Sequence, residues 1–331
     1  MTVNDSGAAV RDGRPLPVEV PDLVARARAG QPRAVARLIS LVENGSPQLR
    51  EIMAELCAAR PDRARIIGLT GSPGVGKSTS TGMLVQAFRK RGRRVGVLAV
   101  DPSSPFTGGA LLGDRVRMQD HATDPEVFIR SMASRGHLGG LSWATPQALR
   151  VLEAAGCEVI LIETVGVGQA EVDIASLADT TIVLLAPGMG DGVQAAKAGI
   201  LEIADVFVVN KADRDGAQAA VRELRNMIAL VERAWKPPIV QTVAYRGEGA
   251  EDVVDALDAH LAYLEKSGEL ARRRRVRARD EIEAIALTAL RARFAHLHGD
   301  RRLDALATRV LEDGLDPYRA ADELLAAVGD R

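Results

Sequence analysis

The segment 71–78 constrains the fold most, because its sequence, GSPGVGKS, matches the phosphate-loop pattern GxxxxGK[ST]. The apolar run 66–69 precedes it and a helical pattern over 78–91 follows it, which is the strand, loop and helix order that this pattern requires. Glycines let successive backbone N–H groups curl around phosphate oxygens, and the N-terminus of the next helix favours negative charge. The segment therefore predicts a nucleoside triphosphate site, with an incidental glycine-rich turn as the alternative.

Short apolar runs alternate with helical patterns through the middle of the chain. The runs are continuous rather than alternating with polar residues, which predicts parallel strands covered by helices on both faces. The runs are 66–69, 95–100, 159–162, 181–186, 206–209 and 239–243, and the helical patterns are 78–91, 145–155, 192–203, 215–233 and 249–264. We therefore predict an α/β fold with a doubly wound, mostly parallel sheet, where ligands bind at the carboxyl ends of the strands.

The two ends of the chain differ from this middle part. Residues 1–20 are rich in Gly, Pro and Asp and are predicted to be disordered. Apolar residues at helical spacing predict an N-terminal helical arm over 21–62. Three further helical patterns without a strand predict a C-terminal helical arm over 268–331. The P-loop domain is therefore expected over 63–267, between two helical extensions.

The charge balance gives no sign of a polyanionic partner. The chain has 43 Lys and Arg against 44 Asp and Glu residues, so no net field attracts nucleic acid or an anionic membrane. The arginine-rich run 272–279 is interpreted as a solvated or partner-facing helix surface, with nucleic-acid binding as the less favoured alternative.

Cys57 and Cys157 form no paired motif, and no apolar stretch has the length of a signal or a membrane span. We expect a cytoplasmic protein with no nucleic acid and no membrane among its partners.

The motif NKAD (210–213) predicts which base is bound. It follows the run 206–209 directly, so it lies at the carboxyl end of a predicted strand. The Asp213 carboxylate accepts two hydrogen bonds, and guanine offers N1–H and its 2-amino group as a matching pair of donors, whereas adenine does not. The Asn210 amide is expected to steady the loop and the purine edge, and the Lys211 stem to pack over the ring. The motif predicts GTP and GDP as the ligands.

Two carboxylates are candidates for a magnesium site beside the phosphates. Glu163 and Asp101 each follow a predicted strand, and Ser78 supplies a hydroxyl from the phosphate loop. Mg²⁺ prefers oxygen ligands of this kind, and Lys77 brings a positive charge to the β- and γ-phosphates. Small GTPases have Asp-x-x-Gly where this chain has Glu163 and Gly166, whose N–H is placed to sense the γ-phosphate. Each acid taken alone is also compatible with a helix cap or a turn.

The predicted nucleotide contacts come from the phosphate loop, the two strand ends and the loop after the last strand. They are Gly71, Ser72, Gly74, Val75, Gly76, Lys77, Ser78, Thr79, Gly166, Asn210, Lys211, Asp213, Val243 and Ala244.

Six motifs taken together resemble one family, the MeaB/ArgK-like G proteins. They are GSPGVGKST (71–79), LAVDPSSP (98–105), GDR (113–115), IETVGVGQAE (162–171), PGMGDGVQAAKAG (187–199) and NKAD (210–213). The resemblance extends over roughly residues 20–330, although the tail after 268 matches only in length and helical character. It implies a P-loop GTPase of the signal-recognition, nickel-chaperone and MinD-type class.

The resemblance also implies a function and a partner. Proteins of this family act as GTPase chaperones of adenosylcobalamin-dependent methylmalonyl-CoA mutase, where GTP gates cofactor loading, protection and reactivation. It implies a homodimer joined through the C-terminal helices. The family's metal and switch carboxylates match Asp101, Asp114 and Glu163, and its partner-responsive switch matches Asp191, Gln194 and Lys197. We take Lys77, Asp101, Glu163 and Lys197 as the catalytic candidates, and Ser78, Asp101, Asp114 and Glu163 as the metal candidates.

Two other functions remain as alternatives. A GTPase that inserts a metallocofactor into another metalloenzyme shares the α/β core, but a nickel chaperone would need Cys or His ligands near the switch, and the sequence has none there. A nucleic-acid-associated GTPase would use the arginine run 272–279, and its affinity would fall steeply with salt.

Overall fold

The structure is a computed structural model that describes residues 2–3, 9–11, 14–15, 19–58, 63–101, 121, 123–133, 144–164, 170–188, 200–294 and 301–329. The chain divides into two compact units, Met1–Arg273 and Arg274–Arg331.

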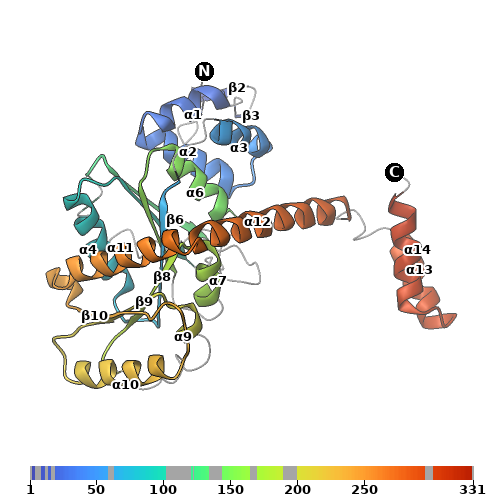
Figure 1. Ribbon diagram of the computed structural model, residues 1–331. Helices are drawn as coiled ribbons and strands as arrows, with labels where there is room; N and C mark the ends of the chain where they lie inside the picture. Colours follow the sequence, from blue (N-terminus) through green and yellow to red (C-terminus); the bar gives the residue numbers. More distant parts are fainter. Residues whose placement is uncertain are drawn as a thin grey trace. The chain divides into compact units, whose positions relative to one another are not determined.

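A seven-stranded parallel sheet forms the centre of the first unit (Figure 1). Its strands lie in the order β10-β9-β8-β4-β7-β5-β6, and each neighbouring pair is parallel. Strands β4, β7, β8 and β9 are buried along their whole length, as continuous apolar runs require. The predicted α/β fold is therefore confirmed. The strands are β4 (Arg65–Thr70), β5 (Val95–Asp101), β6 (Val127–Ala133), β7 (Val159–Thr164), β8 (Thr180–Leu185), β9 (Val206–Asn210) and β10 (Ile239–Thr242).

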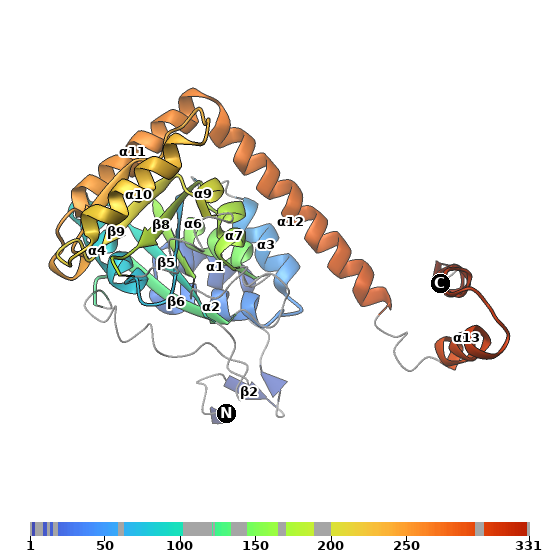
Figure 2. The same ribbon diagram turned by 90° about the horizontal axis from the view of Figure 1, so that it is seen from below.

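Helices cover both faces of this sheet (Figure 2). Helices α4 (Lys77–Lys90) and α11 (Ala250–Lys266) pack on one face, where their apolar residues join those of the strands in one core cluster. Helices α6 (Thr145–Ala154), α7 (Ala170–Leu177) and α10 (Ala217–Ala229) lie on the opposite face. Because successive strand residues point to opposite faces, Ile66 and Ile67 of β4 enter different clusters.

Three helices precede the sheet in the chain and share its core. Helices α1 (Val20–Arg28), α2 (Pro32–Glu43) and α3 (Leu49–Ala58) bury their apolar stripes with α6 and with β5 and β6. Earlier in the chain the structure has three short antiparallel strands, Thr2–Val3, Ala9–Arg11 and Arg14–Pro15. Only parts of residues 1–20 are described, so the disorder expected there stays a prediction.

Strand β6 and helix α7 are among the elements of the first unit that the sequence did not predict. Strand β6 lies at one edge of the sheet, and its sequence, VFIRSMA, interrupts the apolar run with Arg130 and Ser131. Arg130 is tied to α2 through Ser40 (2.9 Å) and Glu43 (3.3 Å). The short helix α7 was also missed. Of the helix predicted over 192–203, the structure describes Ile200–Ile203 (α9) as helical, and residues 192–199 lie outside the described residues.

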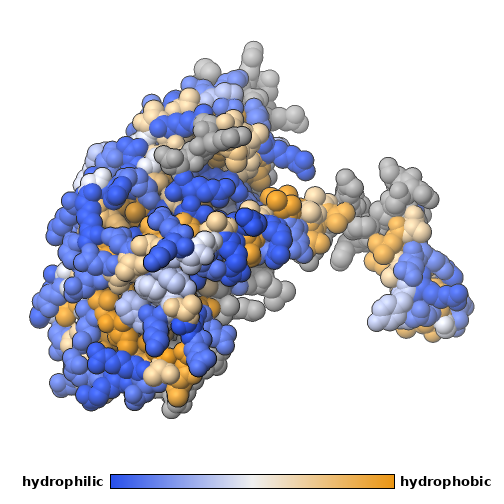
Figure 3. All heavy atoms as spheres, viewed as in Figure 1, coloured by the Kyte–Doolittle hydropathy of each residue, from blue (hydrophilic) through white to orange (hydrophobic). Residues whose placement is uncertain are grey.

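The second unit contains helices and no strand among its described residues. It holds most of α12 (Glu269–Phe294), then α13 (Arg301–Glu312) and α14 (Pro317–Gly329). Apolar side chains gather along the second half of α12 (Figure 3). Ile282, Ile285, Leu287 and Leu290 are each 46–68% exposed. Within the described ranges, no helix combines the length and the apolar character that a membrane crossing needs.

Candidate nucleotide site

The loop between β4 and α4 has a backbone that only glycine adopts without strain. Gly71 and Gly76 have φ values of 142° and 96°. A Cβ on Gly71 would lie 2.3 Å from the Leu184 carbonyl oxygen, and one on Gly76 would lie 2.5 Å from Nδ2 of Asn210. The loop is therefore pressed against the ends of β8 and β9, which is why both positions exclude a side chain.

The ammonium group of Lys77 contacts the backbone of its own loop. Nζ of Lys77 donates to the carbonyl oxygens of Gly71 (2.6 Å) and Ser72 (3.1 Å), and the residue is 8% exposed. These contacts hold the ammonium group beside the loop's backbone, where it is suited to phosphate oxygens.

Two hydroxyls of α4 hold the carboxylate at the end of β7. Ser78 Oγ donates to Glu163 Oε1 at 2.6 Å, and Thr81 Oγ1 lies 3.0 Å from Glu163 Oε2. Glu163 is 2% exposed, and Thr81 is fully buried. The sequence predicts Ser78 and Glu163 as members of one site but not Thr81. The signal for it is the spacing of three residues from Ser78, which places both hydroxyls on one helix face.

The protein's own donors fit Mg²⁺ only as part of its coordination shell. Ser78 and Glu163 offer the hard oxygen atoms that Mg²⁺ prefers. Within the described residues, no group of three or more His, Cys, Asp or Glu side chains could hold a metal ion. The set therefore suits a cation that takes its remaining ligands from water and phosphate, as Mg²⁺ does at nucleotide sites.

Asn210 links three parts of the site through one buried amide. Its Nδ2 donates to the Val75 carbonyl at 2.8 Å, which ties the end of β9 to the phosphate loop. Its Oδ1 accepts from Thr242 Oγ1 and from the Ala244 backbone N–H, both at 3.1 Å, which ties it to the end of β10. These contacts join the phosphate loop, the end of β9 and the start of the loop after β10 through one side chain.

Lys211 and Asp213 of the motif are less buried than Asn210. Lys211 has a positive φ of 58°, and its Nζ donates to the Gly74 carbonyl at 2.6 Å. Asp213 is exposed and accepts a hydrogen bond from the Tyr245 hydroxyl at 3.1 Å. The Arg246 guanidinium lies 5.0 Å from the centre of the Tyr245 ring. The sequence analysis gave the side chains of Tyr245 and Arg246 no role.

The loop after β10 uses its backbone inside the protein. Val243 N–H donates to the Glu248 carbonyl at 3.1 Å, while Ala244 N–H donates to Asn210. The contact of Val243 and Ala244 with the base therefore stays a prediction.

Several predicted site residues cannot be placed. Asp101 ends β5, which is paired with β7 so that Ala99 lies opposite Glu163, but the Asp101 side chain is outside the described part of the structure. Asp114, Gly166, Asp191, Gln194 and Lys197 also lie outside the described residues.

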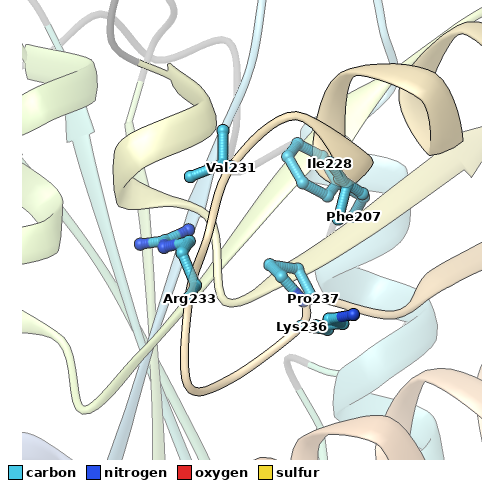
Figure 4. A pocket seen from close by; sticks show the side chains of 6 residues that line it. All are labelled: Phe207, Ile228, Val231, Arg233, Lys236 and Pro237. Atoms are coloured by element: carbon cyan, nitrogen blue, oxygen red, sulfur yellow. The ribbon is translucent and has the colours of Figure 1, made fainter.

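A small pocket beside α10 is formed by residues outside this site. It is lined by Phe207, Ile228, Val231, Arg233, Lys236 and Pro237 (Figure 4). Arg233 donates to the carbonyls of Ala204 and Glu202, so it connects the loop after α10 to the end of α9. We assign this pocket no part in nucleotide binding.

Known proteins resemble the chain over most of its length. A Pyrococcus abyssi protein that is named a putative GTPase is 48% identical over 314 residues, which cover 93% of this chain and 97% of that protein. The mouse protein named methylmalonic aciduria type A homolog, mitochondrial, is 34% identical over 322 residues, 91% of this chain and 78% of the mouse protein. A crystal structure of an LAO/AO transport system kinase has a TM-score of 0.69 at 25% identity, covering 97% of this chain and 100% of that one.

The match to a described family covers the nucleotide site as well as the sheet. The family described as methylmalonyl-CoA mutase-associated GTPase MeaB matches residues 35–298, which include the phosphate loop, Glu163 and the NKAD motif. This chain belongs to the MeaB family of P-loop GTPases.

Proposed function

We propose that this GTPase serves adenosylcobalamin-dependent methylmalonyl-CoA mutase, and that GTP binding and hydrolysis gate cofactor loading, protection and reactivation of that enzyme. The observation that carries the proposal is one continuous site in a chain of the MeaB family: the phosphate loop, Glu163 and the NKAD motif are tied together by hydrogen bonds. The mouse relative, named for methylmalonic aciduria, supports the choice of partner.

The residues of the site have separate tasks in this proposal. Lys77, whose ammonium group lies beside the backbone of the phosphate loop, would counter the charge that develops during phosphoryl transfer. Ser78 and Glu163 would hold Mg²⁺, which would supply positive charge to neutralise part of the phosphate charge. Asp101 and Asp114 are proposed as further metal or water ligands. Asp213 selects guanine over adenine because its carboxylate offers two acceptor sites.

The partner is proposed to act on the segment 187–199, which contains Lys197. A GTPase that gates another enzyme needs two loop states whose balance GTP sets and a partner detects. Lys197 would supply an additional cation to the phosphates on docking, as an arginine finger does in other GTPases. Asp191 and Gln194 belong to the same sequence motif, 187–199, and are assigned to the same switch.

The C-terminal arm is proposed to join two copies of the chain. Among the described residues of α12, Ile282, Ile285, Leu287 and Leu290 expose apolar surface. A homodimer would remove that surface from water.

We also propose that the protein is located in the cytoplasm.

Steady-state GTP hydrolysis with and without the cognate mutase tests the proposal. We expect stimulation of about tenfold or more, which an ordered cation achieves by lowering the barrier by ~1.4 kcal/mol. ATP should give no stimulated turnover, and Lys77→Ala should abolish tight nucleotide binding. Lys197→Ala should keep the basal rate and lose most of the stimulation. GTP turnover that saturating mutase leaves unchanged would reject the gating role and favour another metalloenzyme as the partner.

A further inference from the structure

Thr81 occupies a position that the GTPase motifs do not specify. It lies on α4 three residues after Ser78, and its hydroxyl oxygen is 3.0 Å from Oε2 of Glu163. Ser78 takes the other carboxylate oxygen, Oε1, at 2.6 Å. Each oxygen of one buried carboxylate therefore has its own hydroxyl from the same helix face.

The two hydroxyls are not equivalent, because only Ser78 belongs to the phosphate-loop motif. The proposed metal site uses Ser78 Oγ as a ligand, so its contact with Glu163 must change when a cation binds. Thr81 lies one turn further along the helix and is fully buried. It can keep its contact with Oε2 throughout. The terminal torsion of a glutamate side chain is broad, so a second fixed oxygen restricts the carboxylate more than one contact alone does.

A competing acceptor does not remove this role. The Thr81 hydroxyl also lies 3.1 Å from the Lys77 backbone carbonyl, and it has one hydrogen to give. A carboxylate oxygen is the stronger acceptor, because charge-assisted hydrogen bonds are about twice as strong as neutral ones. The neighbouring residue offers a contrast: Ser80 is also buried, but its hydroxyl has no hydrogen-bond partner among the described residues.

We propose that Thr81 is a positioning residue that holds Oε2 of Glu163, so that Oε1 stays directed at the magnesium position beside Ser78. The inference rests on the proposed magnesium site and adds to it a residue that touches neither nucleotide nor metal. Thr81 acts through Glu163, so its loss should weaken the response to Mg²⁺ and leave metal-free nucleotide binding intact.

The test is a fluorescence titration of GDP binding to the full chain over a range of Mg²⁺ concentrations and in EDTA. Thr81→Val should raise the Mg²⁺ concentration that gives half the effect about tenfold, the expected cost of losing a hydrogen bond to a charged group. Affinity in EDTA should stay within about twofold of the wild type. Thr81→Ser keeps the hydroxyl and should restore the Mg²⁺ response. Ser80→Ala, the matched loss of a buried hydroxyl, should behave like the wild type.

The controls separate this inference from simple packing and from the magnesium proposal. Thr81→Ala removes the same hydroxyl and replaces the valine variant if that one is unstable. In a Glu163→Gln background, Thr81→Val should have no further effect on the Mg²⁺ response. A Thr81→Val chain with the wild-type Mg²⁺ response would overturn the inference while leaving the magnesium site standing. Wild-type binding that is indifferent to Mg²⁺ would overturn both.

Discussion

Single residues set the shape of the nucleotide site. The close approach of the Asn210 amide to Gly76 explains why position 76 excludes a side chain, since a Cβ there would lie 2.5 Å from Nδ2 of Asn210. Both lone-pair directions of Oδ1 are used by Thr242 and Ala244, so the amide is fixed by both ends. Asn210 thereby holds the phosphate loop at a set distance from the loop that follows β10.

Asp213 lies three residues after Asn210 in the same motif, and its exposed side chain is available to a ligand. Replacing its carboxylate by an amide places a donor where guanine needs an acceptor. We expect Asp213→Asn to lower the preference for GTP over xanthosine triphosphate about a hundredfold, since one hydrogen bond to guanine is lost and one to xanthine is gained, at ~1–3 kcal/mol each. Competition binding with both nucleotides measures the ratio. Asp215→Asn, on the same exposed loop, is the matched control and should keep the wild-type ratio; the same strict preference for GTP in Asp213→Asn would contradict the assignment.

The residues of the nucleotide site could be predicted from the sequence where a motif fixes their spacing. Residues that join the site only through contacts between separate elements were missed. The phosphate loop and NKAD were recognisable because each combines fixed residues with a preceding strand. Thr81 and Tyr245 carry no such pattern. Thr81 meets Glu163 across 82 positions and Tyr245 meets Asp213 across 32, so their roles depend on the packing of separate elements.

Strands, like single residues, were predicted where a local sequence pattern marks them. Strands β4, β7, β8 and β9 were predicted because strands buried on both faces need continuous apolar sequence. Strand β6 was not, because an edge strand pairs on one side only and tolerates a polar residue such as Arg130.

A cluster of buried polar and aromatic side chains lies where β8, β9, α11 and the start of α12 meet. His260 is fully buried, with Nδ1 2.9 Å from Thr180 Oγ1 and Nε2 3.3 Å from Asp205 Oδ1. Arg273 donates to both oxygens of Asp205, at 2.9 and 3.1 Å. The Trp235 ring lies 4.9 Å from the imidazole. This cluster fastens the start of α12 to the sheet without using any residue of the nucleotide site.

Burial lowers the pKa of His260 from 6.5 to about 4, with nearby arginines adding to the effect and Asp205 opposing it. The folded protein therefore keeps this imidazole neutral while the unfolded chain takes up a proton at its ordinary pKa. We expect the His260 contribution to stability to be complete above pH 6.5 and to be lost as the pH falls toward about 4, at a cost of roughly 3 kcal/mol. Urea unfolding at several pH values measures this slope. His260→Gln should show a flatter slope than the wild type, and equal slopes would contradict the prediction.

The whole molecule combines a GTPase unit with a helical C-terminal unit of different character. The first unit buries its apolar residues in three clusters around the sheet. In the second unit, the described part of α12 exposes several large apolar side chains, a pattern typical of a surface that another chain covers. The sequence predicted the helices of this arm but could not show what covers them, because an apolar stripe alone does not identify its partner.

The central claim is that the nucleotide state of this GTPase is coupled to binding of the mutase. The most direct measurement is the affinity of the mutase for the full chain loaded with GDP, compared with the chain loaded with a non-hydrolysable GTP analogue. We predict dissociation constants that differ by at least about fivefold, with the mutase shifting the relative affinity for the two nucleotides by the same factor, as linkage requires. Equal dissociation constants in the two nucleotide states, or no binding in either, would contradict the account.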